Sequence, residues 1–264
     1  MSQPRRASPP RGTIGNAAAL GRPRLHMRVT DSTNERAREL AIAGAPHGTL
    51  VTAAEQSAGR GRQGRRWSAP AGSALLMSLV LRRPPELLPL MAAVAVCDAA
   101  GENTLIKWPN DVVVPQGAPP PALAKLAGIL IEARLQEQWA VLGIGLNVAV
   151  RLEDLPPELQ PGAKGPQARP AATLGLTPGD VEPALQALLR ALERRLAEPA
   201  AQTLAAWRAR DALLGREIGW AGEHGVARGL DGAGRLVVER ADGTRATLSA
   251  GEVHLTPASS LRGR

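Results

Sequence analysis

The loop Gln56–Trp67, with the sequence QSAGRGRQGRRW, combines three glycines with four arginines. Its glycines allow the backbone to approach a ligand closely, and successive backbone amides in such a loop form a concave site for anions. Its arginines add planar groups that match carboxylates and phosphates. The loop therefore predicts a site for a polyanion. The alternative is a solvated basic turn, because runs of charge are most often merely solvated.

The glycines of this loop also match the pattern G-x-G-x-x-G of dinucleotide-binding folds, at Gly59, Gly61 and Gly64. That pattern requires a helix directly after the loop and an acidic residue about 20 positions further on. Here a proline and a glycine follow, and no acidic residue occurs before Glu86. The context therefore excludes a dinucleotide-binding fold.

The segments around the loop alternate between strand and helix patterns. Before it, residues 24–29 and 49–53 predict strands, and Asp31-Ser32-Thr33 is typical of a helix start. After it, the pattern predicts strands at 74–81, 104–108, 111–114, 126–135 and 139–147, and helices at 86–100, 180–198 and 200–212. This order predicts an α+β fold with a mixed, mostly antiparallel sheet.

Composition divides the chain into three parts. Residues 1–22 are rich in proline, glycine and arginine and lack a periodic apolar face, which predicts a disordered N-terminal tail. Residues 23–212 carry the strand and helix patterns of one larger domain. In residues 213–264, short alternating strands are separated by glycine-containing turns, which predicts a small β-barrel.

The net charge of +8 is concentrated in a few places. Residues 1–22 and 258–264 contain six arginines and no acidic residue, so the net charge of the remaining chain is +2. Four more arginines lie within residues 60–66. The positive charge therefore marks a local site, and the absence of phenylalanine and tyrosine removes the usual side chains for stacking on bases. DNA is not an expected partner.

The apolar segments indicate a cytoplasmic protein without membrane contact. The longest of them, residues 87–97, is shorter than the roughly 18 to 20 residues of a membrane span, and no apolar signal core follows the N-terminus. The single cysteine, Cys97, lies in an apolar helical pattern, which favours a structural role over a nucleophilic one.

Two short motifs place charged groups at strand ends. KWPND (107–111) combines a cation, an amide and a carboxylate, and an aspartate beside a polyphosphate site is a natural Mg²⁺ ligand. A hairpin turn at Asn110-Asp111 is the alternative interpretation. In KLAGILIE (125–132), Lys125 stands at the start of a predicted strand. By itself, a lysine at this position most often prevents an edge strand from pairing with another molecule. Only three of the 32 basic residues are lysines, so lysine at these positions suggests a need for a compact cation.

The order and spacing of five motifs resemble the biotin protein ligase family. They are DSTN (31–34), AEQSAGRGRQGRRW (54–67), KWPND (107–111), KLAGILIE (125–132) and GIGLNV (143–148). The resemblance implies a catalytic domain like that of class II aminoacyl-tRNA synthetases, followed by a C-terminal SH3-like β-barrel. Because residues 1–22 are too few for a winged helix-turn-helix, it points to the monofunctional class without the DNA-binding domain.

The resemblance also implies roles for individual residues. Ser32, Thr33 and Gln56 would hydrogen-bond the ureido ring of biotin, with Asn34 beside them. Gly59, Arg60, Gly61 and Arg62 would wrap the biotin carboxylate and the adenylate phosphate. Lys125 would contact both reacting groups, so Lys125, Arg60 and Arg62 form the expected catalytic set. Asn110, Asp111 and Asn147 would lie on the nucleotide side, with Arg65 near the triphosphate and Asp111 as the ligand of Mg²⁺.

The expected activity is that of a ligase that forms an amide bond. It would convert biotin and ATP to biotinyl-5'-AMP and transfer the biotin to a lysine of a biotin carboxyl carrier protein, acting as a monomer or homodimer. A lipoate or octanoyl protein ligase or transferase of the same fold is one alternative, and a nucleic-acid-binding protein is another. Gln63, where many members have a basic residue, departs from the family pattern, as does the proline-rich connection 115–124, which could leave Lys125 on a mobile hairpin.

Overall fold

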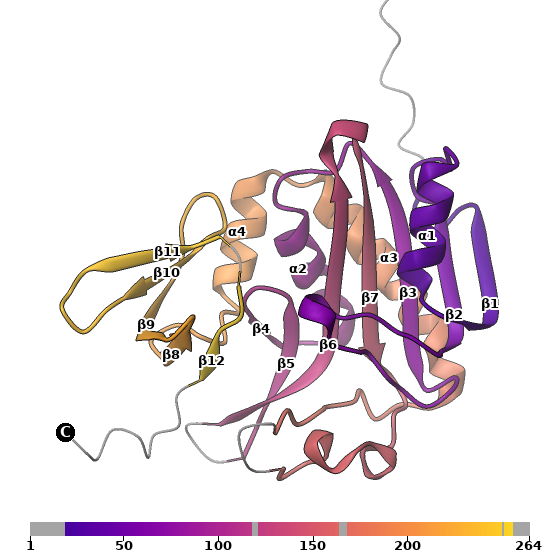
Figure 1. Ribbon diagram of the computed structural model, residues 1–264. Helices are drawn as coiled ribbons and strands as arrows, with labels where there is room; N and C mark the ends of the chain where they lie inside the picture. Colours follow the sequence, from indigo (N-terminus) through magenta and orange to yellow (C-terminus); the bar gives the residue numbers. More distant parts are fainter. Residues whose placement is uncertain (1–18, 118–120, 164–167, 250, 256–264) are drawn as a thin grey trace, which may run out of the picture.

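The computed structural model describes residues 19–117, 121–163, 168–249 and 251–255, and in this part of the chain the strands form two sheets (Figure 1). The larger sheet has the order β1-β2-β3-β7-β6-β5-β4. Its strands are β1 (Arg24–Thr30), β2 (Leu50–Gln56), β3 (Ala74–Arg82), β4 (Leu105–Lys107), β5 (Asp111–Gln116), β6 (Ala122–Arg134) and β7 (Trp139–Asn147). β1 and β2 are parallel and every other pair is antiparallel, which confirms the mixed, mostly antiparallel sheet.

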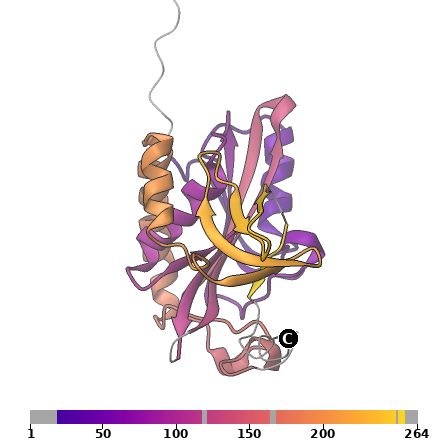
Figure 2. The same ribbon diagram turned by 90° about the vertical axis from the view of Figure 1, so that its left-hand side faces the viewer.

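Helices cover both faces of this sheet. α1 (Thr33–Ile42) lies on one face, and α2 (Leu88–Ala100) and α3 (Val181–Ala197) lie on the other, with α4 (Ala200–Arg208) next to α2 (Figure 2). The apolar run of β3 explains why both faces are covered. Its residues Met77 and Leu79 belong to the main core with α2, whereas Val80 packs with Ala37 of α1. Each such side chain contributes about 1.5–3 kcal/mol when buried, so a strand that is apolar on both sides requires two layers of helices.

α2 is apolar around its whole circumference, and it is buried between the sheet and α3. Its Cys97 is fully buried, and burial raises the pKa of the thiol to about 11. A thiol that stays protonated is a poor nucleophile, which agrees with the structural role predicted for Cys97.

Asp98, the residue after Cys97, joins α2 through ion pairs to the end of α3 and to the turn after α4. Its Oδ2 accepts hydrogen bonds from Arg194 (2.8 Å) and Arg195 (2.7 Å) at the end of α3, and Oδ1 lies 3.6 Å from Arg210. Burial works to raise the pKa of the carboxyl, but the hydrogen bonds from Arg195 and Arg194 and the charge of Arg210 hold it below its usual value.

We expect Asp98→Asn to lower the free energy of unfolding at neutral pH by about 1–3 kcal/mol, because Arg195 and Arg194 lose charge-assisted bonds. Since the folded pKa is depressed, this stabilisation is present above the unfolded pKa of about 3.9 and is lost as the pH falls through the folded value. Urea unfolding at pH 7 and pH 3 measures both effects. Asp154→Asn, whose exposed carboxylate pairs with Arg151 at 3.5 Å, is the control and should change little. An equal loss for both variants would contradict the structural role of Asp98.

The smaller sheet is antiparallel and has the order β11-β10-β9-β8-β12. Its strands are β8 (Glu217–Trp220), β9 (Glu223–Leu230), β10 (Leu236–Glu239), β11 (Arg245–Leu248) and β12 (His254–Leu255). The turn at Gly234 has a left-handed backbone (φ 77°), and its carbonyl accepts a bond from Trp108 Nε1 (3.4 Å) of the larger domain. The small β-domain predicted for the C-terminal part is therefore present, packed beside α2 and α4 (Figure 1).

The structure corrects the bounds of two predicted segments. The predicted tail 1–22 reaches too far, because Leu20 is buried and its N–H donates to Glu193 Oε1 (2.9 Å); residues 1–18 lie outside the described part. The predicted connection 115–124 is shorter, since β5 continues to Gln116 and β6 begins at Ala122. Lys125 is therefore the fourth residue of β6 and pairs with Val113 of β5, so it is held in the sheet.

Within the residues that the structure describes, none of the helices combines the length and apolar character needed to span a membrane.

Candidate active site

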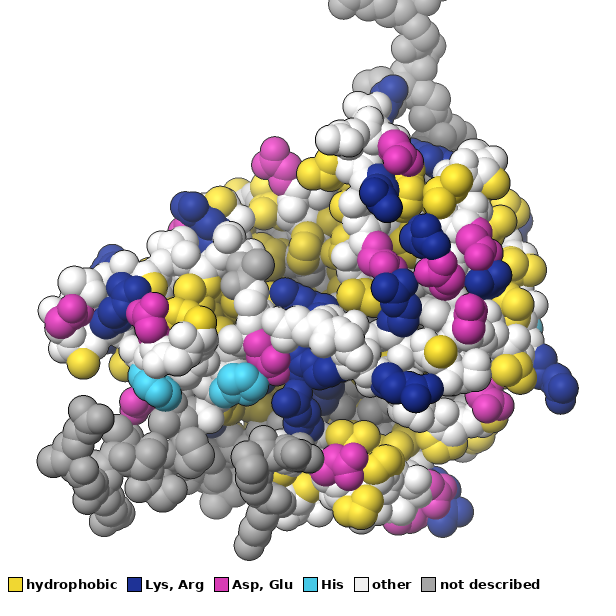
Figure 3. Space-filling model, in the orientation of Figure 1, with side chains coloured by type: hydrophobic (Ala, Val, Ile, Leu, Met, Phe, Trp, Pro, Cys, Tyr) yellow, Lys and Arg dark blue, Asp and Glu magenta, His cyan; other side chains and the backbone are white. Residues whose placement is uncertain are grey.

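The predicted site residues converge on one cavity of about 180 Å³, on the sheet face that carries α1. Basic side chains gather in the hollow of this face (Figure 3). All of the predicted binding residues except Gly59 line it: Ser32, Thr33, Asn34, Gln56, Arg60, Gly61, Arg62, Arg65, Asn110, Asp111, Lys125 and Asn147. Segments that are up to about a hundred residues apart in sequence therefore meet as the motif order predicts.

The glycine-rich loop is a tight hairpin across the mouth of this cavity. Arg60 and Arg66 pair as an isolated antiparallel bridge, and the N–H of Gly61 donates to the carbonyl of Arg65 (2.7 Å). A Cβ on Gly59 would collide with the carbonyl oxygen of Trp67. Gly59 is therefore required for the closure of the hairpin, whereas the predicted direct contact with a ligand is left to its neighbours. Gln63, the departure from the family pattern, adopts a left-handed backbone (φ 54°) at the exposed tip.

The floor of the cavity is made of glycines on β6 and β7. Gly128 and Gly145 pair with each other, and the indole of Trp67 lies so close that a Cβ on Gly145 would be 2.5 Å from its Cε2 atom. A Cβ on Gly143 would collide with the amide of Asn34. These three glycines leave room for the indole of Trp67 and the amide of Asn34, which side chains at the same positions would displace. The motifs KLAGILIE and GIGLNV contain these glycines but did not predict a role for them, although glycine inside a strand signals a close approach.

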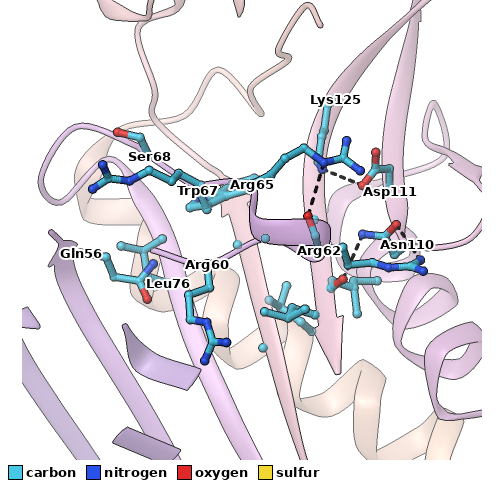
Figure 4. Close-up of a pocket in the computed structure, with 18 of the residues that line it drawn as sticks. Gln56, Arg60, Arg62, Arg65, Trp67, Ser68, Leu76, Asn110, Asp111 and Lys125 are labelled. Atoms are coloured by element: carbon cyan, nitrogen blue, oxygen red, sulfur yellow. Dashed lines mark hydrogen bonds and ion pairs between the residues drawn. The ribbon is translucent and has the colours of Figure 1, made fainter. Parts of the chain in front are cut away.

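Cations and amides collect at one end of this cavity. Lys125 Nζ lies 2.6 Å from Asp111 Oδ1, and Arg62 donates to Asn110 Oδ1 (3.3 Å) (Figure 4). Asn110 is fixed in turn, because its amide donates to the carbonyl of Ile129 (3.1 Å). Lys125 Nζ also lies 5.7 Å from the centre of the Trp67 ring. This end can therefore hold a phosphate between Lys125 and Arg62.

A second lysine, Lys107, lies behind these groups. Burial lowers its pKa and the neighbouring positive charge of Lys125 acts in the same direction, while Asp111 opposes the shift. Lys107 thus adds to the positive potential around Asp111 without lining the cavity.

Arg60 points away from Lys125 and Asp111, toward the opposite end of the cavity (Figure 4). Its guanidinium lies 3.2 Å from Glu35 Oε2 and 3.3 Å from Glu132 Oε1. The structure therefore does not bring the Arg60 guanidinium to Lys125 and Arg62, and its role on the reacting groups stays a prediction. The carboxylates of Glu35 on α1 and Glu132 on β6 form ion pairs with its side chain, and no local pattern in the sequence predicted these pairs.

The end opposite Lys125 is polar and buried. Thr33 donates from its backbone N–H (2.7 Å) and from its hydroxyl (3.0 Å) to Gln56 Oε1. Ser32, Thr33 and Asn34 at the start of α1 are all buried. Such closely spaced donors and acceptors suit a small polar ring. On the far wall, Asn147 is held by a bond from its amide to the carbonyl of Ala172 (2.8 Å).

The small C-terminal domain also reaches this site. Arg65 NH1 lies 2.7 Å from Glu252 Oε1, and Arg169 NH1 lies 3.4 Å from the same oxygen. Glu252 comes just before β12, so it ties the glycine-rich loop to the C-terminal domain. The sequence predicted a nucleotide-side role for Arg65 but not this partner.

Comparison with known proteins agrees with this geometry. A model of the Biotin/lipoate A/B protein ligase family matches residues 26–148, and a model of the Biotin protein ligase C terminal domain matches residues 214–255. The chain is 36% identical to the biotin–[acetyl-CoA-carboxylase] ligase of Paracoccus denitrificans over 249 residues, which are 85% of this chain and 97% of that protein.

Two further relatives show how far the similarity extends. The Bifunctional ligase/repressor BirA of Bacillus spizizenii is 41% identical over 154 residues, which are 53% of this chain and 45% of that protein. This chain thus matches less than half of that relative's length. The structure of biotin protein ligase from Aquifex aeolicus in complex with biotin and ATP matches with a TM-score of 0.71 and 25% identity, covering 90% of this chain and all of that one. The chain therefore belongs to the Biotin/lipoate A/B protein ligase family and, within it, to the biotin protein ligases.

Proposed function

We propose that this protein joins biotin and ATP to form biotinyl-5'-AMP and then transfers the biotin to a lysine of a biotin carboxyl carrier protein. The observation that carries the proposal is one cavity with a polar slot at Thr33 and Gln56 and cations at Lys125 and Arg62. These two ends suit a ligand with a polar ring at one end and a carboxylate at the other. The Aquifex aeolicus relative, which was solved with biotin and ATP, supports the same assignment.

The reaction brings together two anions, the biotin carboxylate and the α-phosphate of ATP. The carboxylate oxygen attacks phosphorus while pyrophosphate leaves, and a lysine amine of the carrier later attacks the acyl carbon and releases AMP. Lys125 and Arg62 would reduce the repulsion in the first step by holding both anions, and the hairpin 57–66 would exclude water from the anhydride. Because the reaction consumes ATP, we propose that it takes place in the cytoplasm.

Asp111 fits a role in holding Mg²⁺ together with the nucleotide. Among the described residues no group of three or more histidine, cysteine or acidic side chains could hold a metal ion alone. Of the carboxylates in the described part of the chain, only that of Asp111 lines the cavity. Mg²⁺ commonly combines one or two carboxylates with phosphate oxygens and water, so one carboxylate beside a triphosphate is sufficient. Bound there, Mg²⁺ would neutralise charge on the departing pyrophosphate.

We expect Asp111→Asn to raise the Mg²⁺ concentration needed for half-maximal adenylate formation by about tenfold, since one charged contact of about 1.5 kcal/mol is lost. The affinity for biotin without ATP should stay within about twofold of wild type, because Asp111 is assigned to the nucleotide and its Mg²⁺ and not to biotin. Titrations of Mg²⁺ in a pyrophosphate-release assay, and calorimetry with biotin, measure the two quantities. Glu153→Gln is a control on an exposed carboxylate. A large loss of biotin affinity would contradict the assignment.

The function is tested by incubating the protein with ATP, Mg²⁺, biotin and a carrier domain, and recording intact mass. A carrier that gains the mass of one biotin supports the proposal, and a carrier of unchanged mass overturns it. Exchange of labelled pyrophosphate into ATP with biotin or with lipoate separates the lipoate ligase alternative. An electrophoretic shift with random DNA at moderate salt tests the nucleic-acid-binding alternative, which predicts steep salt dependence.

A further inference from the structure

Glu252 of the C-terminal domain faces two arginines that line the cavity, although it does not line the cavity itself. Its Oε1 atom lies 2.7 Å from the guanidinium of Arg65 and 3.4 Å from that of Arg169. Glu252 is the more buried partner, with 25% of its side chain exposed against 41% for Arg65 and 46% for Arg169. The carboxylate therefore holds two longer and more exposed side chains next to each other.

Three separate segments bring these side chains together. Arg65 lies in the glycine-rich hairpin, and Arg169 lies in the connection before α3, where its N–H donates to the carbonyl of Glu158 (2.9 Å). Glu252 precedes the buried Val253 and β12, which pairs with β8. Because each backbone has its own contacts, the freedom that remains is that of the two arginine side chains. The shared carboxylate restricts this freedom.

The carboxylate leaves most of the arginine donors available. A guanidinium has five N–H donors in a planar fork. Among the described residues, Glu252 is the one side-chain hydrogen-bond partner of Arg169, at 3.4 Å. The hydrogen bonds of Arg65 within the hairpin are long, at 3.4 and 3.5 Å. The remaining donors of both arginines can therefore bind a second anion while Glu252 stays in place.

The position of these donors matches the cationic end of the cavity. The side chain of Arg65 extends toward Lys125 and Asp111 (Figure 4). Without Glu252, the guanidiniums of Arg65 and Arg169 would repel each other, because like charges that share one small region interact unfavourably. Each side chain would then turn more often into solvent. The carboxylate thus stabilises an arrangement of cations that would not persist by itself.

We propose that Glu252 is a positioning residue that holds Arg65 and Arg169 together as a clamp for the phosphates of ATP. This inference rests on the proposed function, in which ATP occupies the Lys125 end of the cavity. It predicts an effect opposite in sign to that of charge alone. A carboxylate near a polyanion is repulsive, so its removal by itself would tighten ATP binding. Loss of the clamp weakens ATP binding instead.

The test measures, by calorimetry, the dissociation constant of a non-hydrolysable ATP analogue in the presence of Mg²⁺ and biotin. Glu252→Gln should raise this constant by about tenfold, since one charge-assisted contact with phosphate is lost. The rate of adenylate formation at saturating ATP should stay within about threefold of wild type, because Glu252 contacts neither reacting group. Glu223→Gln is the matched control in the same domain. Its carboxylate pairs with Arg240 (2.6 Å) outside the cavity, so ATP binding should not change.

A second background shows whether Glu252 acts through the two arginines. In the double variant Arg65→Ala/Arg169→Ala, Glu252 has no arginine left to position. Adding Glu252→Gln to this background should therefore not weaken ATP binding further. In the otherwise unchanged chain, Glu252→Asp keeps a carboxylate on a shorter side chain and should give a smaller loss than Glu252→Gln. If Glu252→Gln does not fold, Arg169→Ala carries the test and should raise the dissociation constant by about tenfold.

Unchanged or tighter ATP binding in Glu252→Gln overturns the inference, and so does a further loss of equal size in the double-alanine background. Where Glu252→Gln does not fold, unchanged binding in Arg169→Ala overturns it. A wild type that binds the ATP analogue but forms no adenylate overturns the proposed function, while the binding constants still decide the role of Glu252. A wild type that does not bind the analogue overturns both.

Discussion

Replacing Lys125 with alanine is expected to lower the rate of biotinyl-5'-AMP formation by a factor of about 10²–10³, which is typical for the loss of one preorganised group that stabilises developing charge. The ammonium of Lys125 lies 2.6 Å from Asp111 Oδ1, in a strand whose backbone is paired on both sides. It is therefore held in place before substrates bind. Lys125→Arg should restore only a small part of the rate, because a planar fork cannot replace a compact cation between two reacting anions.

Single-turnover formation of adenylate, measured with labelled ATP at saturating biotin, separates this loss from weaker binding. The melting temperature should change by a few degrees at most, since Lys125 is partly exposed. Arg151→Ala, on a highly exposed side chain, serves as a control for the removal of positive charge. If Lys125→Arg were as active as the wild type, Lys125 would not be the residue that contacts both reacting groups.

Arg62→Gly is expected to form biotinyl-5'-AMP but to release it from the site faster than the wild type does. Arg62 stands at the turn of the hairpin, where it donates to Asn110 and lines the cavity at its Lys125 end. Glycine removes both the cover and the charge. The loss of one charge-assisted hydrogen bond is worth about 1.5–3 kcal/mol, which raises the dissociation constant of the adenylate by about tenfold to a hundredfold. Biotinyl-5'-AMP should then escape into solution and acylate exposed amines.

The experiment incubates the variant with biotin, ATP and a bystander such as serum albumin, beside the carrier domain. The wild type should label the carrier alone, and Arg62→Gly should label both. Arg151→Gly is the control for the loss of an arginine, because Arg151 is highly exposed and does not line the cavity. If Arg62→Gly formed adenylate yet neither released it faster nor labelled the bystander, Arg62 would not cover the anhydride.

Local patterns were sufficient to predict the order of the elements. The apolar run of β3 and the periodic apolar face of α3 are strong local patterns. Both elements begin and end within one residue of the predicted bounds. The start of β6 was misplaced for a physical reason. Residues 115–124 contain prolines, which usually interrupt strands, but this hairpin is long enough for Pro115 to pair with Leu123.

The site was predictable where a motif carries its own chemistry, and not where a partner comes from a distant element. Lys125, Asp111 and Gln56 are brought together as their motifs suggested. Glu132, however, lies 98 positions from Asn34, whose amide donates to it, and Glu252 meets Arg65 from another domain. In sequence, each is one acidic residue in a strand or loop. Nothing local distinguishes it from a solvated charge, because its role depends on which cation or amide the fold places beside it.

The glycine floor has a consequence at the level of the gene. Every missense change in codons 128, 143 and 145 adds at least a Cβ atom, and that atom would meet the Trp67 ring at 3.0 Å for Gly128 and at 2.5 Å for Gly145, or the amide of Asn34 for Gly143. Exchange among small amino acids, which is often harmless elsewhere on a strand, would displace the Asn34 amide at 143 and the Trp67 ring at 145, whereas at 128 the ring would have to move by only a few tenths of an ångström. In a library of random variants selected for ligase activity, codons 143 and 145 would therefore vary only at their silent third base.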